Sequence, residues 1–185
     1  RTEINTMVVD VKDESGMVFH MSDVPVARRI GARRTDYDAV ELATTMDDRD
    51  IYLVGRVVAF QDPVAAQAIP KMAVMDRATG EPFTKNGQWF LDPTDHAAQK
   101  YAIDIGVEAC RAGFDEIQFD YVRYPDGYPD SARFDGPTSE EGRVKTITRF
   151  LETARDRLHE EGCAVGADIF GFIVSIPDDG GIGRS

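Results

Sequence analysis

The chain has 185 residues, 42% of them hydrophobic and 29% charged, which is enough for one domain with a sizeable apolar core. It carries 33 Asp and Glu against 21 Lys and Arg, a formal net charge of -12. Nucleic-acid binding needs clustered Lys and Arg, so this balance argues against a nucleic-acid partner. No apolar run reaches the length of a transmembrane helix.

The sequence does not decide in which cellular compartment the protein is found. Cys110 and Cys163 have no metal-ligand spacing; the pattern favours two buried thiols, and a disulfide also fits. The start of the chain does not resemble a signal peptide. The chain starts abruptly, so a secreted or cell-envelope protein whose leader or anchor is absent from this sequence is consistent with it.

Two early segments have the composition of buried strands. In the first, residues 6–12, alternation places Asp10 and Lys12 on one face. The second, residues 51–60, is apolar on both faces, as is typical of a parallel strand, and carries a single charge, Arg56. Between them, Thr35 is expected to cap a helix from Asp36 to about Met46.

The middle of the chain predicts a hairpin and then a helix. Residues 73–91 contain two short β-like pieces, each around turn residues. The run from Trp89 to Pro93 ends this part of the chain. Thr94 or Asp95 then caps a helix with one apolar stripe. Gly113 is expected to end that helix.

The most informative stretch runs from Gly113 to Gly127. Glu116, Gln118 and Asp120 alternate with apolar residues, which is the period of a β-strand. Burying an unpaired carboxylate costs several kcal/mol, so hydrophobic packing does not explain Asp120. Asp120 is therefore the first candidate functional residue.

A further helix and strand complete the pattern. Residues 138–141 form a capping box for a helix that ends at Gly162, and residues 163–170 form a strand that carries Asp168. Alternating strands and helices indicate a parallel sheet with crossover helices, either doubly wound or a (β/α)-barrel. No Gly-rich phosphate loop follows a strand, and the polar residues fall late on their strands, which favours a TIM barrel. Four such units are too few for eight strands, so a partial barrel with a hairpin insertion is expected.

Several runs resemble a bacterial family of glycoside-hydrolase-like proteins, a TIM-barrel group long catalogued as a domain of unknown function. The likeness rests on residues 113–125, 9–13, 52–62, 89–93 and 167–171. It implies a single domain over residues 1–185 that supplies strands two to five, with further barrel segments outside the chain. It also implies sugar hydrolysis. Gln118 stands where α-amylase-like barrels have an Arg, so the analogy does not extend to amylases.

Glycoside hydrolysis generally uses two carboxyl groups, one protonated and one ionised. Asp120 and Asp168 end neighbouring predicted strands, which lie roughly 4.8 Å apart, a spacing that suits a retaining pair. Asp120 is predicted as the nucleophile and Asp168 as the acid/base. The alternatives are purely structural roles: an ion pair of Asp120 with Arg56 or Lys12, and a hydrogen-bonded strand end at Asp168.

The other candidates are expected to bind a carbohydrate substrate, and no cofactor is predicted. They are Asp10, Lys12, Arg56, Asp62, Trp89, Arg123 and Tyr124. Trp89 and Tyr124 suit either sugar stacking or local packing, and Arg123 is expected to pair with an acid. Two other classes remain open: a metal-dependent barrel enzyme holding Mg²⁺ on Asp10, Asp13, Asp120 and Asp168, and a carbohydrate-binding protein without catalysis.

Overall fold

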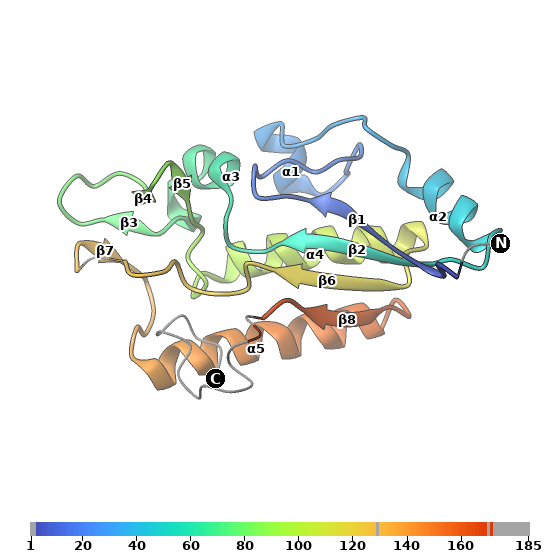
Figure 1. The fold of residues 1–185 in the computed structure, drawn as a ribbon. Helices are drawn as coiled ribbons and strands as arrows, with labels where there is room; N and C mark the ends of the chain where they lie inside the picture. Colours follow the sequence, from blue (N-terminus) through green and yellow to red (C-terminus); the bar gives the residue numbers. More distant parts are fainter. Residues whose placement is uncertain (1–2, 129, 170, 172–185) are drawn as a thin grey trace.

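A four-stranded parallel sheet, ordered β1-β2-β6-β8, forms the centre of the chain (Figure 1). The structure is a computed structural model that describes residues 3–128, 130–169 and 171. In chain order its elements are β1 (Thr6–Lys12), α1 (Pro25–Ile30), α2 (Ala39–Asp47), β2 (Tyr52–Val58), α3 (Pro63–Ala68), the 3-10 helix η1 (Pro70–Met72), β3 (Met75–Asp76), β4 (Thr84–Lys85), β5 (Gln88–Trp89), α4 (His96–Ala112), β6 (Glu116–Asp120), β7 (Ala132–Arg133), α5 (Glu140–His159) and β8 (Ala164–Ala167).

The two faces of the sheet differ in burial. On the helix-covered face Ile117 and Phe119 of β6 are fully buried, and the Phe119 ring lies 5.2 Å from that of Phe150 on α5. Gly55 of β2 lets Phe114 and Val11 pack closely against the strand, since a Cβ there would lie 2.9 Å from an atom of each. The opposite face is more open: Val8 is 56% exposed and Tyr52 is 39% exposed. Polar side chains on that face therefore reach solvent.

A β-bulge in β1 changes which face Lys12 occupies. Asp10 pairs with Arg56 of β2, but the next paired residue of β1 is Lys12, opposite Val57. The extra residue breaks the alternation, as bulges do. Lys12 is consequently buried on the helix side, with its ammonium 5.8 Å from the centre of the Tyr101 ring of α4. The expectation that Asp10 and Lys12 share a face is therefore wrong.

The predicted parallel sheet is confirmed, while several boundaries differ. Helix α2 begins at Ala39 and is capped by Asp38, whose Oδ1 accepts from the Val40 and Glu41 amides, so Thr35 is not the cap. Antiparallel pairing is present over the expected hairpin segment 73–91: Met75 bridges Pro82, and β4 pairs with β5. β3 additionally pairs with β7. Among the described helices, none is long and apolar enough to span a lipid bilayer.

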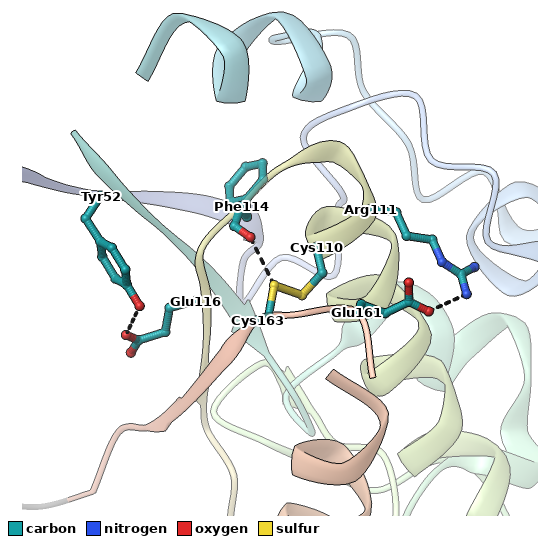
Figure 2. Close-up of a disulfide and its surroundings, with 7 residues drawn as sticks. All are labelled: Tyr52, Cys110, Arg111, Phe114, Glu116, Glu161 and Cys163. Atoms are coloured by element: carbon teal, nitrogen blue, oxygen red, sulfur yellow. Dashed lines mark hydrogen bonds and ion pairs between the residues drawn. A yellow bond between two sulfur atoms is a disulfide. The ribbon is translucent and has the colours of Figure 1, made fainter. Parts of the chain in front are cut away.

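A disulfide joins Cys110 of α4 to Cys163, the residue before β8 (Figure 2). Both residues are buried, as expected, but they are bonded rather than free thiols. The bond links positions 53 residues apart and encloses β6, β7 and α5. Nearby, Arg111 of α4 contacts Glu161 at 2.5 Å, so a second link joins the same two segments.

Removal of this disulfide is expected to destabilise the fold. A closed loop of this length stabilises a protein by about 2–4 kcal/mol, mainly because it restricts the unfolded chain. Cys110→Ser with Cys163→Ser should lower the free energy of unfolding by about that amount, measured by urea titration. Reductant should destabilise the wild type and leave the double variant unchanged; an unaltered wild-type midpoint in reductant would contradict the assignment.

The segment between β1 and α2 is tied to α4 through Glu108. His20 Nε2 lies 2.9 Å from Glu108 Oε2, and the Asp23 amide donates to Oε1 at 2.6 Å. Burial alone would raise the pKa of Glu108, but hydrogen bonds from His20, Ser22 and the Asp23 amide outweigh it and lower that pKa. The folded protein therefore favours the Glu108 carboxylate.

This lowered pKa predicts a pH-dependent contribution to stability. Because the folded pKa of Glu108 lies below the unfolded value of about 4.3, its stabilisation is present above that value and is lost as pH falls through the folded pKa. Glu108→Gln should be less stable than wild type at neutral pH, by about 1–2 kcal/mol, and the difference should shrink toward pH 3. Chemical denaturation across this range tests it, with exposed Glu41→Gln as the control. A difference that does not vary with pH would contradict it.

Candidate functional site

Arg56 of β2 holds carboxylates from the strands on either side. Its Nε and Nη2 donate to Asp120 Oδ2 at 2.9 and 2.6 Å, and its Nη1 donates to Asp10 Oδ1 at 2.8 Å. β1 and β6 both pair with β2, and Asp120 lies opposite Val58. The parallel register thus brings one cation and two acids together on the open face.

Glu14, in the loop after β1, is a fourth member that sequence reasoning missed. Its Oε2 lies 3.3 Å from Arg56 Nη2. The available signal was its place in the polar loop that directly follows the Asp10 strand. The side chains of Arg56 and Asp120 are 22% and 20% exposed, whereas those of Asp10 and Glu14 are 44% and 49% exposed. Asp10 and Glu14 therefore form the more open part of the cluster.

The charge of Arg56 is fixed by these partners. Burial alone would lower the pKa of Arg56, but hydrogen bonds with Asp10 and Asp120 raise it above its usual value. A guanidinium stays protonated in any case, and its planar fork suits carboxylate recognition. Arg56 is therefore a permanent cation at the candidate site.

Asp120 is held on both of its oxygens. The Tyr121 amide donates to Asp120 Oδ1 at 2.6 Å. Tyr121 itself has φ 46, in the left-handed region, which costs a non-glycine residue roughly 1–2 kcal/mol. Such strain persists only where the surroundings impose it, and it is common at functional sites. Here the strained turn directly follows Asp120.

Asp168 lies beside Asp120. Its backbone amide donates to Phe119 O at 2.9 Å, which continues the β6–β8 pairing by one residue. Its Oδ1 accepts a hydrogen bond from Gln118 Nε2 at 2.6 Å. Gln118 and Asp120 alternate onto one face of β6, so both aspartates belong to the open side of the sheet. The contacts expected if the two aspartates had purely structural roles are thus present: Asp120 pairs with Arg56, and Asp168 accepts a hydrogen bond from Gln118.

Lys12 and Asp62, predicted to bind substrate, form a buried pair instead. Their side chains are 0% exposed, and Lys12 Nζ lies 3.0 Å from Asp62 Oδ2. Lys12 also donates to Val58 O at 2.8 Å, and Asp62 Oδ1 accepts from the Ala65 amide at the start of α3. Closed off from solvent, the pair joins the end of β1 to α3, and neither residue is placed to contact a substrate.

Tyr124 is also not a sugar platform. It is fully buried, its hydroxyl donates to Pro137 O at 3.1 Å, and its ring lies 5.2 Å from that of Phe134. Arg123 pairs with Asp126 at 2.8 Å, as expected. Trp89 is partly exposed on the small β4–β5 sheet and packs against the core.

The acids do not converge as a metal site would. Arg56 lies between Asp10 and Asp120 and bonds both, so its charge already offsets part of theirs. Within residues 3–128, 130–169 and 171, no group of three or more His, Cys, Asp or Glu side chains is arranged to hold a metal ion. The structure thus gives the predicted magnesium alternative no ligand set among these residues.

A family model described as "Putative glycosyl hydrolase domain" matches residues 1–185. The chain belongs to this family. The resemblance noted in the sequence is therefore correct. A search of curated proteins found no match.

Solved structures share the fold of this chain. A hypothetical protein from Ruminiclostridium thermocellum is 38% identical with a TM-score of 0.81, and the match covers 93% of this chain and 87% of that one. An α-galactosidase from Thermus thermophilus has 17% identity and a TM-score of 0.59, covering 92% of this chain and 33% of its own. A family 20 β-N-acetylglucosaminidase has 15% identity and a TM-score of 0.58, covering 88% and 36%. The two enzymes show likeness of fold alone, and the chain spans about a third of each.

The buried Lys12–Asp62 pair makes a stability prediction. Lys12→Met would leave Asp62 as an uncompensated buried charge, and breaking such a pair typically costs about 3–5 kcal/mol. Lys12→Met combined with Asp62→Asn should recover part of this loss, because the unpaired charge is removed and the α3 cap is kept. Urea unfolding of both variants measures the effect, with exposed Lys71→Met as the control. Equal stability of Lys12→Met and Lys71→Met would show that the pair is unimportant.

Proposed function

We propose that this chain carries the active site of a glycoside hydrolase that cleaves O-glycosidic bonds with Asp120 and Asp168. The observation that supports this most is the placement of two carboxylates at the ends of adjacent parallel strands, on the open face of the sheet. Catalytic groups of α/β-barrel enzymes collect at this end of the strands. Membership of a glycosyl-hydrolase family agrees with this chemistry.

Asp120 is the better candidate for the ionised partner. A carboxylate offers about four acceptor sites. Asp120 uses three of them, for Arg56 Nε, Arg56 Nη2 and the Tyr121 amide. One lone pair therefore stays available for attack on an anomeric carbon. Arg56 and the strained turn at Tyr121 would hold that oxygen in position. Asp120 is thus proposed as the nucleophile.

Asp168 suits the proton-transfer role. Gln118 donates to its Oδ1, which orients the carboxyl group and leaves Oδ2 to carry the proton for the leaving oxygen. Retaining glycosidases place their two carboxyl groups about 5–5.5 Å apart, close to the spacing of roughly 4.8 Å between adjacent strands. We therefore expect retention of anomeric configuration. In that mechanism Asp168 would protonate the departing oxygen and then deprotonate the attacking water.

We also propose how this chain fits into a complete barrel. The four parallel strands with helices on one side correspond to a part of a (β/α)8 barrel, resembling its strands two to five, with the β4–β5 hairpin as an insertion. Further strands would complete the cleft, where Asp10 and Glu14 would contact the sugar.

The disulfide agrees with a secreted or cell-envelope location, because such bonds persist in oxidising compartments.

Substitution of either aspartate tests the assignment. Asp120→Asn and Asp168→Asn should each lower hydrolysis of a responsive glycan by at least about a thousandfold, since each removes one of two required carboxyl groups. Exposed Asp47→Asn on α2 is the matched control and should keep wild-type activity. Near-native melting temperatures would show that the losses are chemical.

The activity measurements also distinguish the proposed hydrolase from a non-catalytic carbohydrate-binding protein. Full activity in either aspartate variant would contradict the proposed pair. Glycan binding by the wild type without turnover, across a panel of oligosaccharides, would instead favour a non-catalytic carbohydrate-binding protein. Gln118→Leu should lower activity less than Asp168→Asn and shift the pH profile, because Gln118 acts only by orienting Asp168.

A further inference from the structure

The ring of Tyr121, directly after β6, does not belong to the core. Ile117 and Phe119 of β6 are fully buried on the helix side, and regular alternation would place Tyr121 behind them. Its φ of 46 breaks that alternation. Tyr121 is half-buried, and among the described residues the hydrophobic side chains that form the core or pack against it do not include Tyr121. The ring has therefore left the helix side of the sheet.

This backbone conformation is unfavourable for tyrosine. A left-handed φ suits glycine and is tolerated by Asn and Asp, whereas a bulky side chain is strained there. Burial of the ring in the core could offset that strain, but the Tyr121 ring does not pack there. Strained residues of this kind cluster at active sites and ligand clamps. A contact of the ring with a ligand is therefore a physical reason for a tyrosine at this position.

Arg123 supports the ring. Its guanidinium lies over the Tyr121 ring, 5.3 Å from the ring centre, which is within the range of a cation–π contact. The Arg123 side chain is only 11% exposed, and it bonds Asp126 at 2.8 Å and Tyr124 O at 3.3 Å. A held cation thus backs one face of the ring. The ring is consequently a preorganised flat surface, and preorganisation lowers the entropic cost of binding.

The position of Tyr121 relative to Asp120 indicates what the ring could contact. The Tyr121 amide donates to Asp120 Oδ1 at 2.6 Å, so the residue touches the proposed nucleophile. A sugar that presents its anomeric carbon to Asp120 comes within reach of the ring. Aromatic rings suit the apolar C–H face of a pyranose. The Tyr121 hydroxyl makes no hydrogen bond with a described residue, so it is available to a sugar hydroxyl.

We propose that the Tyr121 ring is the platform on which the sugar unit next to the cleaved bond stacks, with Arg123 as its support. This assignment rests on the proposed function. The ligand class is a pyranose that presents an unsubstituted C–H face to the ring. Stacking is made by bound substrate and transition state alike, so it should lower KM and leave kcat nearly unaffected.

Substitution of Tyr121 separates the ring from the backbone. Tyr121→Asn removes the ring, while Asn tolerates the left-handed turn and keeps the amide that Asp120 accepts from. For a hydrolysed glycan its KM should rise about ten- to a hundredfold, with kcat within about twofold of wild type. The melting temperature should stay near that of wild type, because relief of the strain offsets the lost contact with Arg123.

Two controls accompany this variant. Tyr121→Phe keeps the ring and should raise KM by no more than about threefold. Tyr52→Asn removes an exposed tyrosine at the other end of the same sheet, opposite Thr6, and should keep the wild-type KM. An unchanged KM in Tyr121→Asn would overturn the proposal. Loss of kcat alone would also overturn it, because Tyr121 would then act only by holding Asp120.

A binding measurement keeps this proposal apart from the hydrolase function. Maltotriose, cellotriose and the trimer of N-acetylglucosamine, with any oligosaccharide that the wild type hydrolyses, are titrated into Asp168→Asn. Nuclear magnetic resonance follows the Tyr121 ring signals, which are assigned by their absence from Tyr121→Asn. At least one sugar should shift these signals saturably, and no shift with any of them would overturn the platform.

The two kinds of failure look different. If the Tyr121 signals shift while the wild type hydrolyses none of these sugars, the platform stands and the hydrolase function fails. If the wild type hydrolyses a glycan while Tyr121→Asn keeps the wild-type KM, the platform fails alone.

Discussion

The interaction on which this site depends is the pairing of one arginine with acids from both neighbouring strands. Without Arg56, Asp10 and Asp120 would be like charges on the same face of a sheet, with Glu14 nearby. Coulomb repulsion between partly buried carboxylates is strong, and the opposite charge turns it into a favourable network. Arg56 also fixes the Asp120 carboxylate through two of its nitrogens. The same contact therefore stabilises the end of the sheet and positions a reactive oxygen.

Much of this arrangement could be predicted from sequence. The parallel sheet is predicted from apolar strands that alternate with amphipathic helices, and Arg56 is one of the two ion-pair partners expected for Asp120. The helix caps at Asp95 and Ser139 and the stop at Gly113 also agree with local rules. These features depend on near neighbours in the chain, which is why pattern reasoning finds them.

The errors have a common physical source. A bulge after Asp10 shifted Lys12 to the helix side, and no residue type in that strand signals the extra residue. Tyr124 lies beyond the left-handed Tyr121, and there its burial is set by packing on Phe134 from a later segment. The disulfide, which the sequence leaves open beside two free thiols, likewise requires the tertiary placement of Cys110 on α4 against Cys163. Each miss concerns a contact or backbone irregularity that only the assembled fold specifies.

The disulfide also imposes an order on the biogenesis of the protein. Cys163 is made after the whole of β6 and α5, so the covalent ring cannot close while either is still being synthesised. Until then Cys110 must wait as a reduced thiol on a helix that has already emerged. β8 and then Asp168 follow directly, so the second proposed carboxyl group reaches the sheet only after the ring's last residue has been made. Oxidative maturation and completion of the candidate site thus fall at the same late stage.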